Sequence, residues 1–157
     1  MNFNLNHCEF CLHLYQGSFH TDGEGTILTT AECLLNKNRN ENMSKEEIEK
    51  TILKYLGGTK MIWLPFGLAF DDDTNGHVDN IACFARPGEV VLSWTNDESD
   101  INRHRFKEAE RVLMQEVDAK GRSFKIHKLH IPNAMVSSQI FFDIQNDGTT
   151  QMFFPLY

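Results

Sequence analysis

The segment Asp71–Asn80 carries the residues of this chain whose types and spacing are best suited to chemistry. It reads Asp-Asp-Asp-Thr-Asn-Gly-His-Val-Asp-Asn, so His77 stands two residues before a carboxylate, Asp79, directly after an acidic turn. The alternating apolar residues that follow predict a strand over residues 78–84, on which His77 and Asp79 would project from the same face. Such a face offers a proton carrier beside an anion, although a solvated turn before a strand has the same composition.

A second, shorter His-x-Asp motif lies within Ser18–Gly23, where His20 and Asp22 recur at the same offset. The two matches are a weak indication of an internal repeat. They also leave open a metallohydrolase, in which both motifs would converge on one metal ion. Such sites usually offer more than two histidines or a bridging carboxylate pattern, so this alternative explains less of the sequence.

Length and composition favour one folded domain over residues 1–157, because 41% of the residues are hydrophobic and twelve are Phe. Fifteen basic and twenty-two acidic side chains give a net charge of -7, which disfavours nucleic acid as a partner and suits a cationic ligand. The first residues lack a basic segment followed by an apolar run, and no later stretch is long enough to span a bilayer. We therefore expect a cytoplasmic protein that does not contact a membrane.

The four cysteines stand at positions 8, 11, 33 and 83, too scattered for a disulfide scaffold, so reduced thiols are expected. Cys8 and Cys11, flanked by histidines, have the spacing of a zinc knuckle, but the sequence has no second Cys-x-x-Cys or His-x-x-x-His pair to complete the ligand set. The alternative is an apolar N-terminal strand. Cys33 and Cys83 are interpreted as small core residues, and no cofactor is expected.

Apolar periodicity predicts a single mixed α/β unit without a linker. Ser44 and Glu47 form a capping box that begins a helix, and Gly57 ends it. His127 and His130 would lie on opposite faces of a strand, which disfavours a shared metal ion. The expected elements are strand 25–30, exposed loop 36–42, helix 44–56, strand 61–64, a hairpin of strands 78–84 and 90–94, helix 101–117, strand 124–131 and a hairpin within 140–148.

Several motifs in order resemble the agmatine deiminases, of the guanidine-modifying pentein superfamily. The resemblance implies a pseudo-symmetric, five-bladed αβ propeller, of which this chain would form an incomplete domain holding roughly the middle blades. It also implies that the two His-x-Asp motifs reflect repeated units. The motifs that carry the resemblance are Gly17–Thr26, Glu32–Asn40, Trp63–Pro65, Asp71–Asn80 and Asp118–Arg122.

The resemblance implies hydrolysis of a guanidinium group, with agmatine and water giving N-carbamoylputrescine and ammonia on the route to polyamines. Such enzymes use a cysteine thiolate, because a guanidinium carbon is a poor electrophile. His77 would protonate the leaving ammonia and then take a proton from water. Asp79 and Asp73 would bind the small cationic guanidine substrate.

The chain also departs from the family pattern. The family's nucleophile belongs to a Gly-rich His-Cys motif that is absent here, and Tyr15-Gln16-Gly17 replaces a motif that normally supplies a carboxylate. We therefore expect no unaided turnover. A non-catalytic partner or remnant that associates with a full-length paralogue, or a homo-oligomer, stays open as an alternative.

Overall fold

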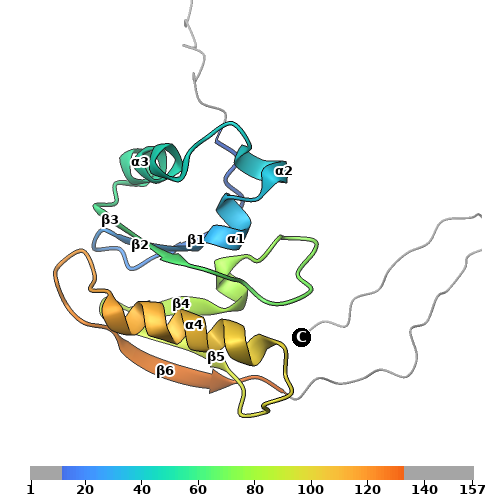
Figure 1. Ribbon diagram of the computed structural model, residues 1–157. Helices are drawn as coiled ribbons and strands as arrows, with labels where there is room; N and C mark the ends of the chain where they lie inside the picture. Colours follow the sequence, from blue (N-terminus) through green and yellow to red (C-terminus); the bar gives the residue numbers. More distant parts are fainter. Residues whose placement is uncertain (1–11, 133–157) are drawn as a thin grey trace, which may run out of the picture.

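The computed structural model describes residues 12–132, which form two three-stranded sheets and four α-helices (Figure 1). In chain order the elements are β1 (Phe19–Thr21), β2 (Thr26–Thr30), α1 (Ala31–Leu34), α2 (Lys37–Asn40), α3 (Lys45–Leu56), β3 (Lys60–Leu64), the 3-10 helix η1 (Val78–Asn80), β4 (Ala82–Arg86), β5 (Glu89–Trp94), α4 (Asn102–Gln115) and β6 (Lys125–His130).

The two sheets repeat one topology. In the first, β2 pairs antiparallel with β1 and parallel with β3, and in the second β5 pairs antiparallel with β4 and parallel with β6. In each unit helices connect the two parallel strands, as such a crossover requires. Residues 12–132 therefore form two ββαβ blades, which agrees with the mixed α/β fold expected from the sequence.

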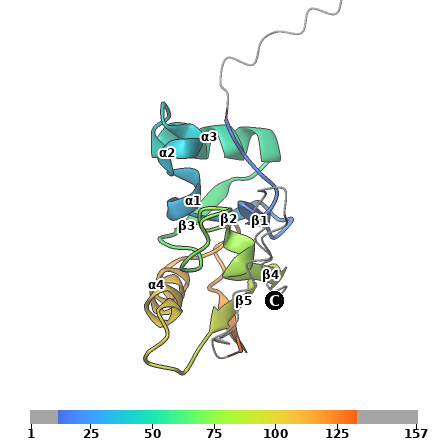
Figure 2. The ribbon, with the colours of Figure 1, turned by 90° about the vertical axis from the view of Figure 1, so that its right-hand side faces the viewer.

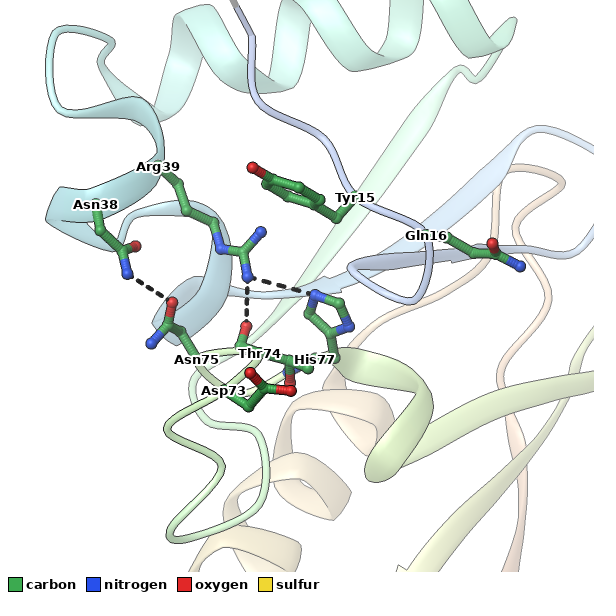
Figure 3. Close-up of a pocket in the computed structure, with 8 residues that line it drawn as sticks. All are labelled: Tyr15, Gln16, Asn38, Arg39, Asp73, Thr74, Asn75 and His77. Carbon is green, nitrogen blue, oxygen red and sulfur yellow. Dashed lines mark hydrogen bonds between the residues drawn. The ribbon is translucent and has the colours of Figure 1, made fainter. Parts of the chain in front are cut away.

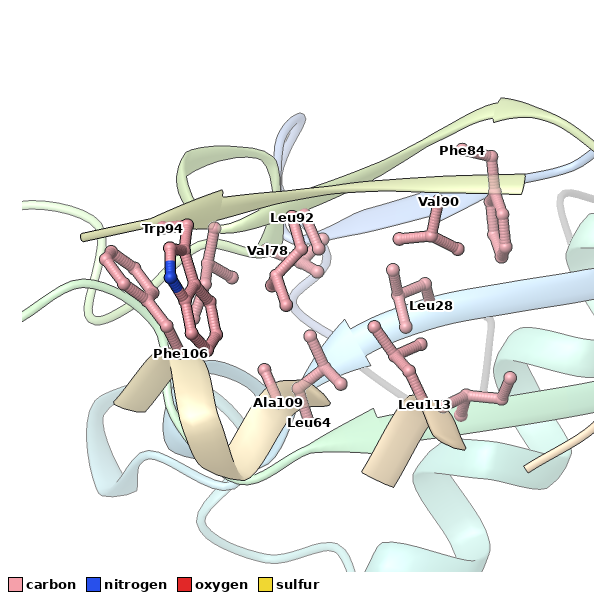
Figure 4. Close-up of a cluster of buried hydrophobic side chains, with 13 residues drawn as sticks. Leu28, Leu64, Val78, Phe84, Val90, Leu92, Trp94, Phe106, Ala109 and Leu113 are labelled. Atoms are coloured by element: carbon pink, nitrogen blue, oxygen red, sulfur yellow. The ribbon is translucent and has the colours of Figure 1, made fainter. Parts of the chain in front are cut away.

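The main hydrophobic core lies between the two blades (Figure 4). Leu28 and Leu64 come from the first sheet, whereas Val90 and Leu92 come from the second and Phe106 from α4. All five are fully buried. The two blades thus share one core.

A second core lies on the opposite face of the first sheet, beneath helices α1–α3 (Figure 2). Successive side chains of a strand point to opposite faces, so Ile27 joins this core while its neighbour Leu28 joins the core between the blades. Ile48 and Ile52 of α3 complete the packing.

Helix α3 forms as its sequence predicts. The Ser44 side chain accepts from the backbone N–H of Glu47, and the Glu47 carboxylate accepts from the N–H of Ser44 at 2.8 Å. Gly57 ends the helix with φ +68°, a conformation that glycine adopts without a steric cost. The predicted strands 25–30, 61–64, 90–94 and 124–131, and the helix 101–117, are also confirmed within a few residues.

Two expectations were wrong. The segment 36–42 is not an exposed loop, because Lys37–Asn40 forms α2 and Asn40 is buried, with its amide donating to the Leu34 carbonyl at 3.1 Å. The predicted strand over 78–84 begins only at Ala82, and Val78–Asn80 is a 3-10 turn instead.

Other expectations concern residues outside 12–132. They are the N-terminal strand, the Cys8–Cys11 zinc alternative and the hairpin within 140–148. In the described part of the chain, no helix is both long and apolar enough to cross a membrane.

Candidate functional site

The acidic motif lies on a loop between β3 and η1 whose two ends touch. A Cβ atom on Gly67 would collide with the backbone of Gly76, so the lack of a side chain at Gly67 allows the close approach. Glu32 of α1 holds the junction, because its carboxylate accepts from the Gly67 N–H at 2.9 Å and from Arg105 of α4 at 2.6 Å. Helices from both blades therefore fix where the loop begins and ends.

Asp71 organises the inside of this loop. Its carboxylate accepts from the backbone N–H of Thr74 at 3.1 Å and of His77 at 3.3 Å, from the Asn80 amide at 3.1 Å, and from the Thr74 hydroxyl. Partial burial by itself would raise the pKa of Asp71, but these hydrogen bonds outweigh it and lower that pKa. Asp71 is an anion that shapes the loop.

His77 and Asp79 converge on Gly17. A Cβ atom added to Gly17 would lie 2.6 Å from both the His77 Nδ1 and the Asp79 Oδ2 atoms. The Asp79 backbone N–H donates to the Gly17 carbonyl at 3.4 Å, which ties η1 to the segment before β1. His77 and Asp79 lie together as expected, but a 3-10 turn rather than a strand brings them to one point.

His77 borders a pocket of about 460 Å³ on the surface beside α2 (Figure 3). Asp73 is exposed and lines the same pocket, whereas Asp79 is exposed but is not among the lining residues. His77 is only 7% exposed. The lining residues are Tyr15, Gln16, Asn38, Arg39, Asp73, Thr74, Asn75 and His77.

Arg39 is a pocket residue whose role the local sequence pattern did not reveal. Its Nη2 atom donates to the Thr74 carbonyl at 2.7 Å and lies 3.5 Å from His77 Nε2. Its guanidinium also stacks 4.6 Å from the centre of the Tyr15 ring. The motif Glu32–Asn40 contains Arg39, but only the tertiary fold places it against His77.

The pKa of His77 lies below the ordinary histidine value of 6.5, first because burial disfavours the charged ring and second because the Arg39 cation is close. The carboxylates Asp79, Asp71 and Asp73 act in the opposite direction but do not reverse the shift. The lowered pKa favours the neutral imidazole, which can accept a proton.

In the second His-x-Asp motif, His20 and Asp22 make structural hydrogen bonds away from the pocket. His20 lies within β1, where its Nδ1 atom accepts from the Phe84 N–H at 3.3 Å. Asp22 closes the turn before β2 by accepting from the backbone of Glu24 and Thr26. The two motifs thus occupy different positions in their blades, since His77 precedes β4. Within residues 12–132 no group of three or more potential ligands is placed to hold a metal ion, so the metallohydrolase alternative gains no support.

The described cysteines differ in burial. Cys33 is fully buried in the core under α1–α3, as expected, and burial raises the pKa of its thiol. Cys83 lies on β4 and is half-buried, so its interpretation as a core residue is only partly correct. Neither cysteine lines the pocket.

A comparison with family models matches residues 2–150 to the Porphyromonas-type peptidyl-arginine deiminases. This chain belongs to that family. Curated relatives include an agmatine deiminase of Medicago truncatula, 54% identical over 123 residues, and one of Pseudomonas aeruginosa, 53% identical over 123 residues. Each alignment covers 78% of this chain and 33% of the relative, so the chain spans about a third of the length of these proteins.

Solved structures of the family have the same fold. The agmatine deiminase of Enterococcus faecalis matches with a TM-score of 0.71 and 46% identity, over 74% of this chain and 32% of that one. A C. jejuni agmatine deiminase with substrate bound matches with a TM-score of 0.67 and 32% identity, over 74% of this chain and 33% of that one. The expected assignment to part of a pentein fold is therefore confirmed.

Proposed function

We propose that this chain supplies the acid–base and cation-binding part of an agmatine deiminase site. The reaction is the hydrolysis of agmatine to N-carbamoylputrescine and ammonia, and its proposed location is the cytoplasm. The observation that carries the proposal is the convergence of His77 Nδ1 and Asp79 Oδ2 on Gly17. The names of the relatives, agmatine deiminases at about half identity, support the same substrate.

In this proposal Asp79 and Asp73 bind the substrate cation. A guanidinium presents parallel N–H donors that a carboxylate accepts in pairs, and agmatine also carries an ammonium group. Both carboxylates are exposed, so neither is committed to the interior of the fold. The net charge of -7 would further attract a dication.

His77 is the proposed acid–base group. The neutral ring first takes the proton of the nucleophilic thiol, and the thiolate adds to the guanidinium carbon. When the C–N bond of this adduct breaks, the imidazolium gives that proton to the departing ammonia. Water then attacks the same carbon, the neutral imidazole takes a proton from it, and the C–S bond breaks to release the ureido product and the thiolate. The lowered pKa of His77 suits the second step, because it favours the neutral ring that accepts the proton.

The nucleophilic thiolate is not one of the two described cysteines in this proposal. Cys33 is buried, and its raised pKa keeps the thiol protonated, while Cys83 lies outside the pocket. Neither cysteine within residues 12–132 fits the nucleophile's role, and we propose that the chain by itself binds agmatine without turning it over.

Agmatine binding is tested by titrating the ¹⁵N-labelled chain and following the backbone signals of Gly17, His77 and Asp79. The variant Asp79→Asn should bind at least about 10-fold more weakly, because a charge-assisted hydrogen bond contributes about 1.5–3 kcal/mol. Asp72→Asn is the matched control, since Asp72 is exposed in the same acidic motif but is not one of the carboxylates whose charge acts on His77. If both variants weaken agmatine binding equally, the loss comes from the change in net charge, and Asp79 does not have the assigned role.

Turnover is tested by incubating the purified chain with agmatine and measuring ureido product and ammonia. The expected yield equals that of the His77→Ala variant. Product above that control would show that the chain is competent unaided.

In a catalytically complete enzyme that carries this site, His77→Ala should lower the turnover number at least ~100-fold, the low end for acid–base catalysis. Near-normal turnover there would remove His77 from the mechanism.

Association with a longer deiminase, or with a second copy of the chain, is a second candidate function. Within residues 12–132, β6 pairs only with β5, and Leu129 on that strand is 60% exposed. An edge strand with an exposed apolar side chain favours pairing with another chain. Sedimentation velocity of the pure chain, and of its mixture with an active deiminase, measures this directly, and a monomer in both samples would exclude it.

A further inference from the structure

The contact between Arg39 and His77 restricts where the imidazole proton can be. A guanidinium has only donors and does not lose its charge in proteins. Its Nη2 atom lies 3.5 Å from His77 Nε2. The contact is favourable when Nε2 offers its lone pair, and it is unfavourable when Nε2 carries a hydrogen that faces a second donor.

We propose that Arg39 is a positioning residue that keeps the His77 ring uncharged and fixes its single proton on Nδ1. The ring then presents an N–H toward Gly17 and Asp79, and a lone pair toward Arg39. This inference deepens the proposed function and rests on it for its catalytic meaning, but the tautomer itself can be measured without substrate.

Two contacts of Arg39 and one of its neighbour Asn38 hold Arg39 beside His77. Nη2 donates to the Thr74 carbonyl at 2.7 Å, and the guanidinium stacks on Tyr15 (Figure 3). The neighbouring Asn38 amide donates to Asn75 at 2.8 Å and so ties α2 to the acidic loop. The Nε and Nη1 atoms of Arg39 are buried without hydrogen-bond partners, so in this arrangement the guanidinium bonds through Nη2.

The charged groups around His77 come from three elements. Arg39 of α2 opposes protonation, whereas Asp71 and Asp73 of the loop and Asp79 of η1 favour it. Burial of the ring adds to the effect of Arg39, and the pKa of His77 is lowered in sum. The electrostatics therefore act in the same direction as the hydrogen-bond geometry.

In catalysis, protonation of His77 on Nε2 would be coupled to the contact between Nε2 and Arg39. His77 can donate as an acid only after the ring has gained a second proton, on Nε2, which would place an N–H against the Arg39 donor. Protonation of the ring must therefore accompany loss of the Arg39–Nε2 contact. The neutral ring can take a proton from water only at Nε2, so the base step too requires that the Arg39 contact be lost, and Arg39 would disfavour a premature imidazolium.

The test is a ¹H–¹⁵N spectrum of the histidine rings in the 157-residue chain, recorded over a pH titration without agmatine. Two-bond couplings distinguish a protonated from an unprotonated ring nitrogen, and the His77→Gln variant assigns the signals. We expect the wild-type chain to show His77 protonated on Nδ1 above its pKa. A ring protonated on Nε2 would overturn the proposal without any variant.

Three variants separate positioning from general stability. Arg39→Met removes the donor and the charge, so the pKa of His77 should rise and the Nδ1–H preference should weaken. Arg39→Gln also removes the charge and offers both an acceptor and a donor, so it should raise the pKa and weaken the Nδ1–H preference, and it serves if Arg39→Met fails to fold. The control Arg111→Met, at an exposed site on α4, should change neither property. An unchanged tautomer and pKa in both Arg39 variants would overturn the proposal, whereas failure of agmatine binding would affect only the proposed function.

Discussion

Gly17 determines how closely the chain can approach His77 and Asp79. Its φ of +89° lies in the left-handed region, and a side chain there would meet both site residues at 2.6 Å. Gly17→Ala should therefore add a steric conflict to the backbone strain of about 1 kcal/mol that alanine incurs at positive φ. We expect a larger loss in the free energy of unfolding, measured by urea denaturation, and displaced NMR signals for His77 and Asp79.

The matched control is Gly23→Ala. Gly23 also has a positive φ, +75°, but a Cβ atom there meets no atom within 4 Å. Its cost should consist of backbone strain alone. If the two variants lose the same stability and leave the His77 and Asp79 signals unmoved, the close packing at Gly17 does not constrain the site.

The depressed pKa of His77 predicts a pH dependence of folding. Between the folded pKa and the unfolded value of 6.5, the unfolded chain binds a proton that the folded chain does not, so the free energy of unfolding falls as pH falls. Asp71 has a lowered pKa too, but its unfolded value of 3.8 places its loss of stability at more acidic pH. Urea denaturation at about pH 7.5 and about pH 5.5 isolates the histidine contribution.

The comparison is between wild type and His77→Gln. The variant lacks the titrating ring, so its stability should decline less over this pH interval, whatever its absolute value. An equal decline in both proteins would mean that His77 has the same pKa in the folded and unfolded states.

The sequence allowed part of this site to be predicted. His77 and Asp79 are two residues apart, so any local conformation that turns both side chains the same way brings them together. Arg39 and Tyr15 could not be placed from the pattern, because long-range contacts set their positions. The role of Asp71 also depended on hydrogen bonds within a folded loop.

At the scale of elements, prediction succeeded where local chemistry decides the structure. The capping box at Ser44 and the glycine at 57 mark α3 because short-range hydrogen bonds and φ preferences define a helix end. Prediction failed at α2, where a polar segment was interpreted as a loop. The buried Asn40 there accepts from the His13 N–H at 2.9 Å, a contact 27 residues apart that no local pattern contains.

The loop that carries the acidic motif depends on Glu32. The Glu32–Arg105 pair joins α1 to α4 at 2.6 Å, and both side chains are less than a third exposed. Glu32→Gln should lower the free energy of unfolding by about 1–2 kcal/mol, because the neutral amide weakens a charge-assisted hydrogen bond. It should also broaden or shift the signals of residues 67–76. Urea denaturation and an amide spectrum measure the two effects.

Glu98→Gln is the control for removing a carboxylate that faces an arginine. Glu98 pairs with Arg103 at 3.2 Å, but its side chain is 87% exposed. Exposed pairs contribute little to stability, so this variant should resemble wild type. If the two substitutions have equal effects, the Glu32–Arg105 pair does not stabilise the loop more than an exposed ion pair would.

At the scale of the whole molecule, the shared core predicts that the two blades unfold together. Leu28 from the first sheet packs in one cluster with Leu92 from the second and Phe106 from α4. Each blade would expose this apolar face if the other unfolded, which disfavours a half-folded intermediate. Leu28→Ala should therefore destabilise both blades, by about 2–5 kcal/mol.

The two tryptophans report on the blades separately. Trp63 lies on β3 and packs against the core beneath α1–α3, whereas Trp94 lies on β5 in the core between the blades. Trp94→Phe and Trp63→Phe each leave one reporter, whose fluorescence follows urea unfolding in its own blade. Each substitution shifts stability somewhat, so circular dichroism of the same sample gives the reference midpoint. We expect fluorescence and circular dichroism to coincide in both variants, and Leu28→Ala to move both reporters. A Trp94 transition that precedes the loss of helical signal would instead show that the second blade unfolds alone, and that the shared core does not make one cooperative unit.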